Sequence, residues 1–287
     1  MKTYVITGGT DGIGKALALT CLEEGHEVMV VGRSAEKGAA WLEAARHHGA
    51  AARAHFVRAD LSLVSETRAV IDRIRMAFAK IDALVLCARH FRTTRLVTAE
   101  GFENTFAHFY LSRFVLCHEL ADMLEAANTP VILNVAGPGG DGEIHWADLQ
   151  HERAYDGHHA LAQGGRLNDL LGVGFADSRP ETTVRYVLLN PGTVSTSFSG
   201  QYTPAVATQI EAMRRSAQPV DEAIAPIHKL LATPPAAPLS AMVRGEPLDP
   251  HGPGFAIEEA RRLREHTKRL LAACGRICGK GPASAVG

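Results

Sequence analysis

A glycine-rich segment, Thr7-Gly8-Gly9-Thr10-Asp11-Gly12-Ile13-Gly14, directly follows the first apolar run of the chain and opens an amphipathic stretch. Glycines at positions 8, 12 and 14 allow a tight turn, close approach of the backbone to a ligand, and close packing of helix on strand. The free N–H groups at the start of such a helix attract phosphate. This order of strand, turn and helix predicts a Rossmann-type fold that binds a dinucleotide. Its candidate contacts are Gly8, Thr10, Asp11, Gly12, Ile13 and Gly14.

Short apolar, β-branched runs alternate with longer amphipathic stretches along the rest of the chain. They predict strands at 3–6, 28–31, 55–57, 83–86, 131–134 and 186–189, with a last strand near 240–244. Helices are expected at 15–24, 36–48, 65–79, 101–124, 161–176, 221–232 and 256–272. Parallel neighbours can be joined only by crossovers, so this alternation predicts an α/β doubly wound parallel sheet with helices on both faces.

The chain has 287 residues, a size at which one α/β domain is common. We expect a single dinucleotide-binding domain over 1–274 and a flexible, Gly- and Ala-rich tail over 275–287. The segment at about 197–218, after the sixth strand, lies where open α/β sheets bind ligands, and it contains an amphipathic piece at 210–214. We interpret it as a substrate lid; the alternative is an ordinary surface connection.

Composition narrows the possible partners. With 46% hydrophobic and 21% charged residues and a formal net charge of -1, the chain offers no electrostatic attraction for nucleic acid or an anionic membrane. The first strand begins at residue 3, which leaves no room for a leader, so we expect a cytoplasmic protein. Five scattered cysteines predict neither a disulfide framework nor a metal site. The sequence makes no prediction about oligomeric state.

The end of the second strand indicates which dinucleotide is bound. An NAD site usually places a carboxylate here, on the ribose hydroxyls. This chain has Arg33 and Ser34 instead, which suit the 2′-phosphate of NADP(H). After the third strand, Asp60 and Leu61 are candidates for the adenine edge, although an aspartate in that place is as often a helix cap.

Several segments together resemble the short-chain dehydrogenase/reductase family over essentially the whole chain, and especially its retinol-dehydrogenase-like branch. They are the glycine turn, Asp60-Leu61, 101–106, Asn134-Val135, 142–150, 168–171 and the run Pro191-Gly192-Thr193-Val194-Ser195-Thr196. The resemblance implies a nicotinamide-dependent oxidoreductase. It also implies that Pro191, Gly192, the backbone of Val194 and the hydroxyl of Thr196 hold the nicotinamide carboxamide.

The same resemblance exposes a gap in the proton-transfer machinery. The family's catalytic Tyr and Lys positions are Leu161 and Gly165, its Ser position is Gly137, and its Asn position is Phe109. None of these side chains can transfer a proton, so no catalytic residue is assigned. A shifted register would bring in Tyr155, but no lysine follows that tyrosine at four residues.

The chain also resembles the atypical ketoreductases that act on aromatic polyketides. This implies NADPH-dependent reduction of a ketone on a polycyclic aromatic substrate, whose own phenolic hydroxyl assists. Phe109, Gly137, Leu161 and Gly165 would form an apolar floor under that ligand, unless they are simply core. The alternatives are a catalytically inactive NADP(H)-binding sensor or interaction protein, and a redox-neutral isomerase or dehydratase. Possible proton donors, none preferred, are His108, His145, His158, His159, Tyr155, Ser195 and Tyr202.

Overall fold

The predicted strands all form, and they lie in one sheet of the computed structural model, which describes residues 1–278. The order is β10-β9-β7-β6-β4-β1-β2-β3. The strands are β1 (Thr3–Thr7), β2 (Glu27–Gly32), β3 (Ala54–Arg58), β4 (Ala83–Leu86), β6 (Val131–Val135), β7 (Arg185–Asn190), β9 (Leu239–Val243) and β10 (Glu246–Leu248). All neighbours are parallel except β9 and β10, which form an antiparallel hairpin that the sequence did not predict. The predicted doubly wound α/β sheet is therefore confirmed, with one added antiparallel strand.

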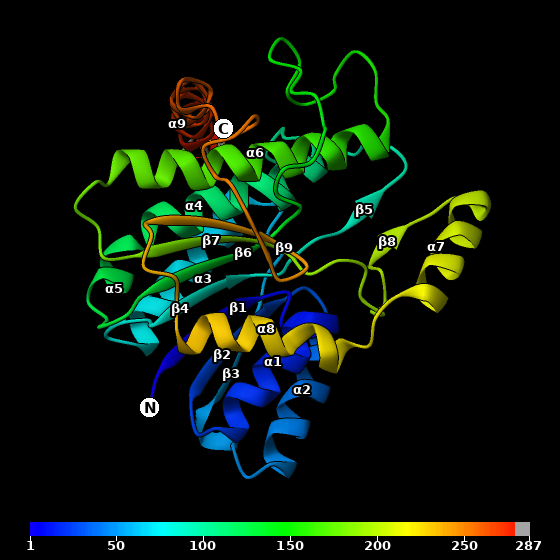
Figure 1. Ribbon diagram of the computed structural model, residues 1–287. Coiled ribbons are helices and arrows are strands. Elements are labelled where there is room, and N and C mark those ends of the chain that lie inside the picture. The colour runs from blue at the N-terminus through cyan, green and yellow to red at the C-terminus, as the bar shows by residue number, and fades with distance from the viewer. Residues whose placement is uncertain (279–287) are drawn as a thin grey trace, which may run out of the picture.

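Helices cover both faces of this sheet (Figure 1). The apolar cluster on one face includes side chains of α1 (Gly12–Glu23), α2 (Ala35–His47) and α8 (Val220–Ala232). The cluster on the other face includes side chains of α3 (Val64–Ala77), α4 (Ser112–Glu119), α5 (Ala121–Glu125), α6 (Gly157–Ser178) and α9 (Ile257–Cys278). A short 3₁₀ turn, η1 (Ala51–Arg53), precedes β3. The strands of the sheet's centre are thus buried on both faces, which explains their continuous apolar runs.

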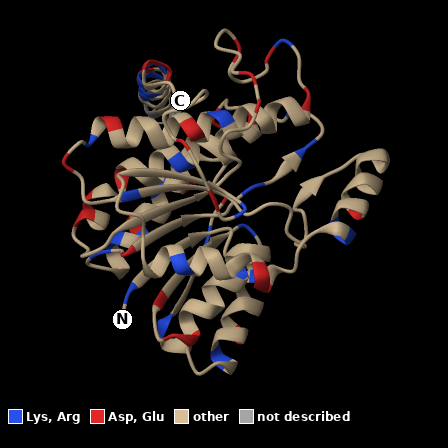
Figure 2. Cartoon of the chain, viewed as in Figure 1, with Lys and Arg blue, Asp and Glu red and all other residues tan. Residues whose placement is uncertain are grey.

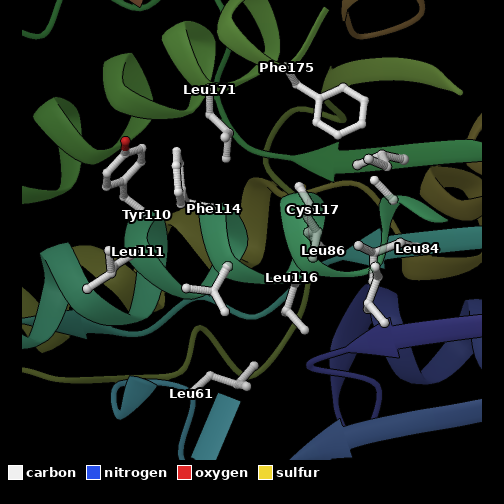
Figure 3. Close-up of a cluster of buried hydrophobic side chains, with 14 of the residues drawn as sticks. Leu61, Leu84, Leu86, Tyr110, Leu111, Phe114, Leu116, Cys117, Leu171 and Phe175 are labelled. Carbon is white, nitrogen blue, oxygen red and sulfur yellow. The ribbon is translucent and has the colours of Figure 1, made fainter. Parts of the chain in front are cut away.

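Figure 3 shows the core on the α4 and α6 side of the sheet. Tyr110 lies just before α4, Phe114 lies in α4, and Leu171 and Phe175 come from α6. The hydroxyl of Tyr110 shares a 2.7 Å hydrogen bond with the hydroxyl of Thr267 on α9. The last helix is therefore joined to this core, and Figure 1 shows it lying against α6.

Helix boundaries differ from the predicted ones where a cap or a bulge decides them. The stretch 101–124 is split into a π-helical turn, η2 (Phe106–Leu111), then α4 and α5. Helix α6 begins four residues earlier than predicted, because the Asp156 carboxylate accepts hydrogen bonds from the backbone of His158 and His159. Helix α9 runs to Cys278, so the first residues of the expected tail are helical. The rest of that tail, 279–287, lies outside the described residues.

The segment predicted as a lid contains two elements. Strand β8 (Gly200–Gln201) pairs in parallel with β5 (Phe91–Arg92), and helix α7 (Pro204–Ser216) follows. Helix α7 has no buried residue and projects away from the sheet (Figure 1). The amphipathic piece at 210–214 is thus the second half of a longer helix, which Thr203 caps.

Charges of both signs are scattered over the outer helices and loops (Figure 2). Within residues 1–278 no helix combines the length and the apolar character needed to cross a bilayer. The same part of the chain contains no group of His, Cys, Asp and Glu side chains suited to a metal ion.

Candidate functional site

The glycine turn lies against the turn that follows β4. Gly8 and Gly12 have φ values of +68° and +49°, which favour glycine. A Cβ on Gly8 would lie 2.9 Å from the backbone of Ala88, and a Cβ on Gly14 would lie 2.6 Å from the carbonyl oxygen of Gly8. No larger residue fits either place without a backbone shift. The turn therefore brings the start of α1 close to the carboxyl ends of β1 and β4.

Asp11 connects this turn to two other elements. One carboxylate oxygen caps α1 by accepting from the N–H of Gly12 at 2.8 Å. The other accepts from the Ser197 hydroxyl at 2.8 Å and forms an ion pair with Lys37 of α2. Burial alone would raise the pKa of this carboxyl, but the hydrogen bonds from Lys37 and Ser197 outweigh it, so the pKa is lowered. Asp11 is therefore a structural anion that joins the glycine turn to α2 and to Ser197, in the segment predicted as a lid.

Two basic residues, Arg33 directly after β2 and Lys37 in the first turn of α2, form a basic corner. Arg33 is exposed, and its guanidinium has no hydrogen-bond or ion-pair partner among the described residues. The Ser34 hydroxyl accepts from the backbone N–H of Lys37 at 3.1 Å and so caps α2. Lys37 was missed in the sequence analysis, although its place four residues after Arg33 could have indicated it. Its pairing with Asp11 brings a second cation to the same end of the sheet.

Asp60 and Leu61 follow β3, as predicted. One Asp60 oxygen accepts from the backbone and the hydroxyl of Ser62, at 3.0 and 2.8 Å. Burial would raise the Asp60 pKa, but these bonds and the nearby charge of Arg33 lower it. Leu61 is buried. The carboxylate is therefore used within its own loop. It does not cap α3, whose N-cap residue is Leu63 and has no side-chain hydrogen bond.

The run from Pro191 to Thr196 reaches back to the glycine turn. Gly192 has a φ of +84°, and its N–H donates to the Asn190 side chain at 2.9 Å. A Cβ on Gly12 would lie 2.7 Å from the Cγ2 methyl of Thr196, so these two residues are in direct contact. The Thr196 hydroxyl accepts from the N–H of Phe198 at 3.3 Å and keeps its own proton for another partner. The run expected at the nicotinamide thus lies against the turn expected at the pyrophosphate.

The four positions that lack the family's proton-transfer groups differ from one another. A Cβ on Gly137 would meet no atom within 4 Å, and a Cβ on Gly165 would meet only the Gly137 carbonyl oxygen, at 3.9 Å. Leu161 is half-buried. Phe109 is 2% exposed, and its ring lies 2.6 Å from the place of a Cβ on Gly164. The two glycines therefore border open space, whereas Phe109 is a packed core residue and does not belong to a ligand-facing floor.

A fully buried cation, Arg113, lies behind Phe109 and was not identified from the sequence. Its guanidinium donates to the carbonyl oxygens of Ala88 at 2.8 Å and Val135 at 3.1 Å, and to the side chain of Asn134. It stacks on the Phe109 ring, with Cζ 4.5 Å from the ring centroid. No carboxylate of the described residues contacts it, and burial lowers its pKa to about 10. A charged residue inside the apolar run 109–117 was the available signal.

Asn134 and Asn168 extend this polar network toward α6. The Asn134 amide donates to the Asn168 side chain and to the Tyr186 hydroxyl, both at 2.9 Å. The Asn168 amide donates to the carbonyl oxygen of Phe109 at 2.9 Å. Buried polar groups that are mutually satisfied rigidify their surroundings. The network therefore holds β4, β6, η2 and α6 in one arrangement beneath the cleft.

The side chains considered as proton donors are dispersed. His108 is buried, its Nδ1 has no partner, and burial lowers its pKa to about 3, so it is neutral at pH 7. The Tyr155 hydroxyl donates to the Arg92 carbonyl at 3.3 Å, and the Tyr202 hydroxyl donates to the Phe198 carbonyl. Phe91 contacts the rings of His158 and Tyr202, with centroids 4.9 and 5.6 Å away. His145 contacts the ring of His151, and the Ser195 N–H donates to the Gln218 carbonyl.

Comparisons with known proteins agree with this geometry. Residues 2–147 match the family described as short chain dehydrogenase. A protein named as a daunorubicin C-13 ketoreductase of Streptomyces sp. (strain C5) is 32% identical over 198 residues, which cover 68% of this chain and 67% of the relative. Human polyprenol dehydrogenase is 26% identical over 167 residues, covering 56% of this chain and 51% of the relative. The matches therefore span about half to two thirds of these relatives.

Solved structures show the same fold at low sequence identity. A short chain dehydrogenase from Burkholderia cenocepacia J2315 in complex with NADP has a TM-score of 0.64 and 20% identity, covering 85% of this chain and 97% of that chain. A short-chain dehydrogenase from Streptomyces avermitilis has a TM-score of 0.62 and 17% identity, covering 96% and 97%.

We predict that Arg113→Met lowers the free energy of unfolding by about 2–4 kcal/mol, because three buried acceptors lose their donor. Urea denaturation followed by circular dichroism measures this change. The matched control is Arg68→Met, which removes an exposed arginine paired with Glu119 and should cost less than about 1 kcal/mol. Equal stability of the two variants would contradict a structural role for the buried cation.

Proposed function

Because the chain belongs to the short-chain dehydrogenase/reductase family of oxidoreductases, we propose that it is an NADPH-dependent ketoreductase that acts on a polycyclic aromatic polyketide. The observation that carries the proposal is the contact of Thr196 with Gly12. It joins the run expected to hold the nicotinamide to the turn expected to hold the pyrophosphate. A protein that bound only the adenine end would have no use for that junction.

The basic corner supports NADP(H) as the cofactor. Arg33 has a guanidinium without a partner, and Lys37 adds an ammonium at the start of α2. A 2′-phosphate is recognised by such cations through charge-assisted hydrogen bonds. The residues present therefore fit this dinucleotide: the glycine turn for the pyrophosphate, Arg33 and Lys37 for the 2′-phosphate, and Val194 and Thr196 for the carboxamide. When bound, NADPH supplies the hydride.

The chain's own residues then have to orient the ketone and tolerate the oxyanion that forms. Gly137 and Gly165 leave room for a flat aromatic substrate where the family places proton-transfer groups. A phenolic hydroxyl beside the ketone donates a hydrogen bond to the oxyanion, and water protonates it afterwards. Loss of a general acid costs about 10²–10⁴ in rate, whereas orientation contributes roughly 7–11 kcal/mol. Catalysis can therefore survive without an acid from the protein.

Two resemblances indicate which class of ketone is the substrate. The daunorubicin relative is named as a ketoreductase, and the chain as a whole resembles the angucyclinone ketoreductase of simocyclinone biosynthesis. We therefore propose an angucyclinone-like ketone as substrate, with a small aromatic molecule rather than nucleic acid or membrane as partner.

A catalytically inactive NADP(H)-binding sensor or interaction protein is the second candidate. The absence of a hydroxyl or amine at Leu161, Gly165 and Gly137 favours it. It accounts less well for the open space beside the two glycines, which a sensor would not need.

Turnover distinguishes the two candidates. We expect NADPH absorbance to fall when the protein is mixed with polycyclic ketones that carry an adjacent phenolic hydroxyl. The matched O-methyl ethers should react at least about 100-fold more slowly, because they cannot donate to the oxyanion. NADPH binding without turnover of any ketone in such a panel would support the sensor.

We predict that Arg33→Ala weakens NADPH binding about tenfold or more and leaves NADH binding unchanged, since only NADPH has the 2′-phosphate. Isothermal titration calorimetry with both dinucleotides measures this. Arg73→Ala, on the exposed face of α3, is the control and should bind both as the unaltered protein does. If the unaltered protein took up neither dinucleotide, the proposed function would be wrong.

His158→Ala and Tyr202→Phe should each keep kcat within about tenfold of the unaltered protein, below the typical effect of losing a general acid. Steady-state kinetics with the phenolic ketone, together with NADPH titration, test this. If either variant abolished turnover while NADPH binding stayed unchanged, that residue would be the proton donor.

A further inference from the structure

A cavity of about 440 Å³ lies beside the Pro191-Gly192 turn, on the face of the sheet that α8 covers. Its apolar part comes from Leu189 of β7 and from Ala223 and Ile227 of α8. Its polar rim includes Ser216, Gln218 and Arg244. The volume is in the range of small-molecule sites, about 300–1,000 Å³. None of the residues assigned above to the pyrophosphate or the 2′-phosphate lines it, whereas Pro191 and Gly192, expected at the nicotinamide carboxamide, do. The cavity therefore adjoins the nicotinamide end of the dinucleotide site.

Arg244 is the one charged residue that lines this cavity within the described part of the chain. Its side chain has no hydrogen bond or ion pair with another described residue, and no carboxylate lines the cavity. The stem packs on the Pro191-Gly192 turn, with Nε 3.2 Å from the place of a Cβ on Gly192. The guanidinium is therefore available to an anion from outside the protein.

The backbone of Arg244 is unusual in the same place. Its φ is +53°, a conformation that residues with a side chain rarely adopt. The hydrogen bond from its N–H to the Asn190 carbonyl, 2.8 Å long, holds it there. Arg244 and Gly245 form the two-residue turn between β9 and β10, which needs positive φ at both positions, so the hairpin fixes the point from which the Arg244 side chain extends.

The rim facing Arg244 is also fixed in position. The Gln218 N–H donates to the Thr193 carbonyl at 3.0 Å, and the Gln218 carbonyl accepts from Ser195 at 2.9 Å. The Gln218 side-chain amide donates to the Pro191 carbonyl. Because these walls are already ordered, they lose little conformational entropy when a ligand binds.

We propose that this cavity binds a small organic carboxylate with an apolar body. The planar guanidinium of Arg244 matches a carboxylate with two parallel hydrogen bonds, and the apolar floor receives the hydrocarbon part of the ligand. Inorganic phosphate would satisfy the arginine and leave that floor uncovered. The proposal does not depend on ketone reduction, because neither Gly137 nor Gly165, the residues assigned to the ketone, lines the cavity.

Benzoate is the probe, with benzamide as its neutral isostere and inorganic phosphate as an anion without an apolar body. The full chain, saturated with NADPH so that the cleft is filled, is labelled at isoleucine methyl groups, and the Ile227 resonance is followed. Benzoate should shift this resonance saturably. Benzamide and phosphate should each bind at least roughly tenfold more weakly than benzoate. Benzamide binding as tightly as benzoate, or no saturable shift with benzoate, would overturn the proposal.

Two variants locate the site. Arg244→Gln should weaken benzoate binding about tenfold or more, as expected for a lost charge-assisted bond, whereas Arg215→Gln, an exposed arginine of α7 outside the cavity lining, should leave it unchanged. Ser216→Trp fills the cavity from an exposed position and should abolish binding without disturbing the core. Thermal melts verify that each variant is folded. If folded Arg244→Gln bound benzoate with unchanged affinity, Arg244 would not be the residue that binds the carboxylate, and the proposal would be wrong.

Discussion

The guanidinium of Arg113 is the interaction on which the arrangement of the cleft depends. Taking a charge out of water costs several kcal/mol unless hydrogen bonds replace its hydration. Here the replacements are the carbonyls of Ala88 and Val135 and the side chain of Asn134. The carboxyl ends of β4 and β6 cannot separate without exposing these groups inside the core. The glycine turn rests on the same Ala88, so its position is set by the same cation.

Much of the fold was accessible from sequence because its signals are local. Apolar runs of strand length, amphipathic stretches between them and a glycine turn at the first junction predict the parallel sheet and the helices on its faces. The elements that were missed have no such signal. Strands β5 and β8 are two residues each and exist only because Phe91-Arg92 pairs with Gly200-Gln201 of the segment predicted as a lid. Strand β10 follows from the left-handed turn at Arg244 and Gly245, which sequence periodicity does not report.

The residues of the candidate site also fall into two groups, those that the sequence identifies and those that it does not. Glycines that must lie close to other backbone were identifiable, because no other residue fits there. Lys37 and Arg113 were not, because what distinguishes them is a partner far away in sequence: Asp11 for the lysine, and the ends of two strands for the arginine. Asp11 itself was expected at a phosphate and is found as a helix cap that also ties Ser197 of the lid. The negative charge of Asp11 reduces the attraction of Lys37 for an anion. This pairing of charges exists only in the folded chain.

The positions without proton-transfer groups are informative because the structure treats them unequally. If large apolar side chains filled all four positions, no room for a substrate would remain there, and a protein that only binds the dinucleotide would be favoured. Instead Phe109 packs in the core against Arg113, and Gly137 and Gly165 lie beside each other and border open space. Buried Arg113 supplies rigidity on one side, and the absent side chains supply volume on the other. A rigid, widened site beside the run proposed to hold the nicotinamide is what a bulky, flat substrate that brings its own hydrogen-bond donor requires. This combination supports reduction of such a substrate more strongly than loss of activity.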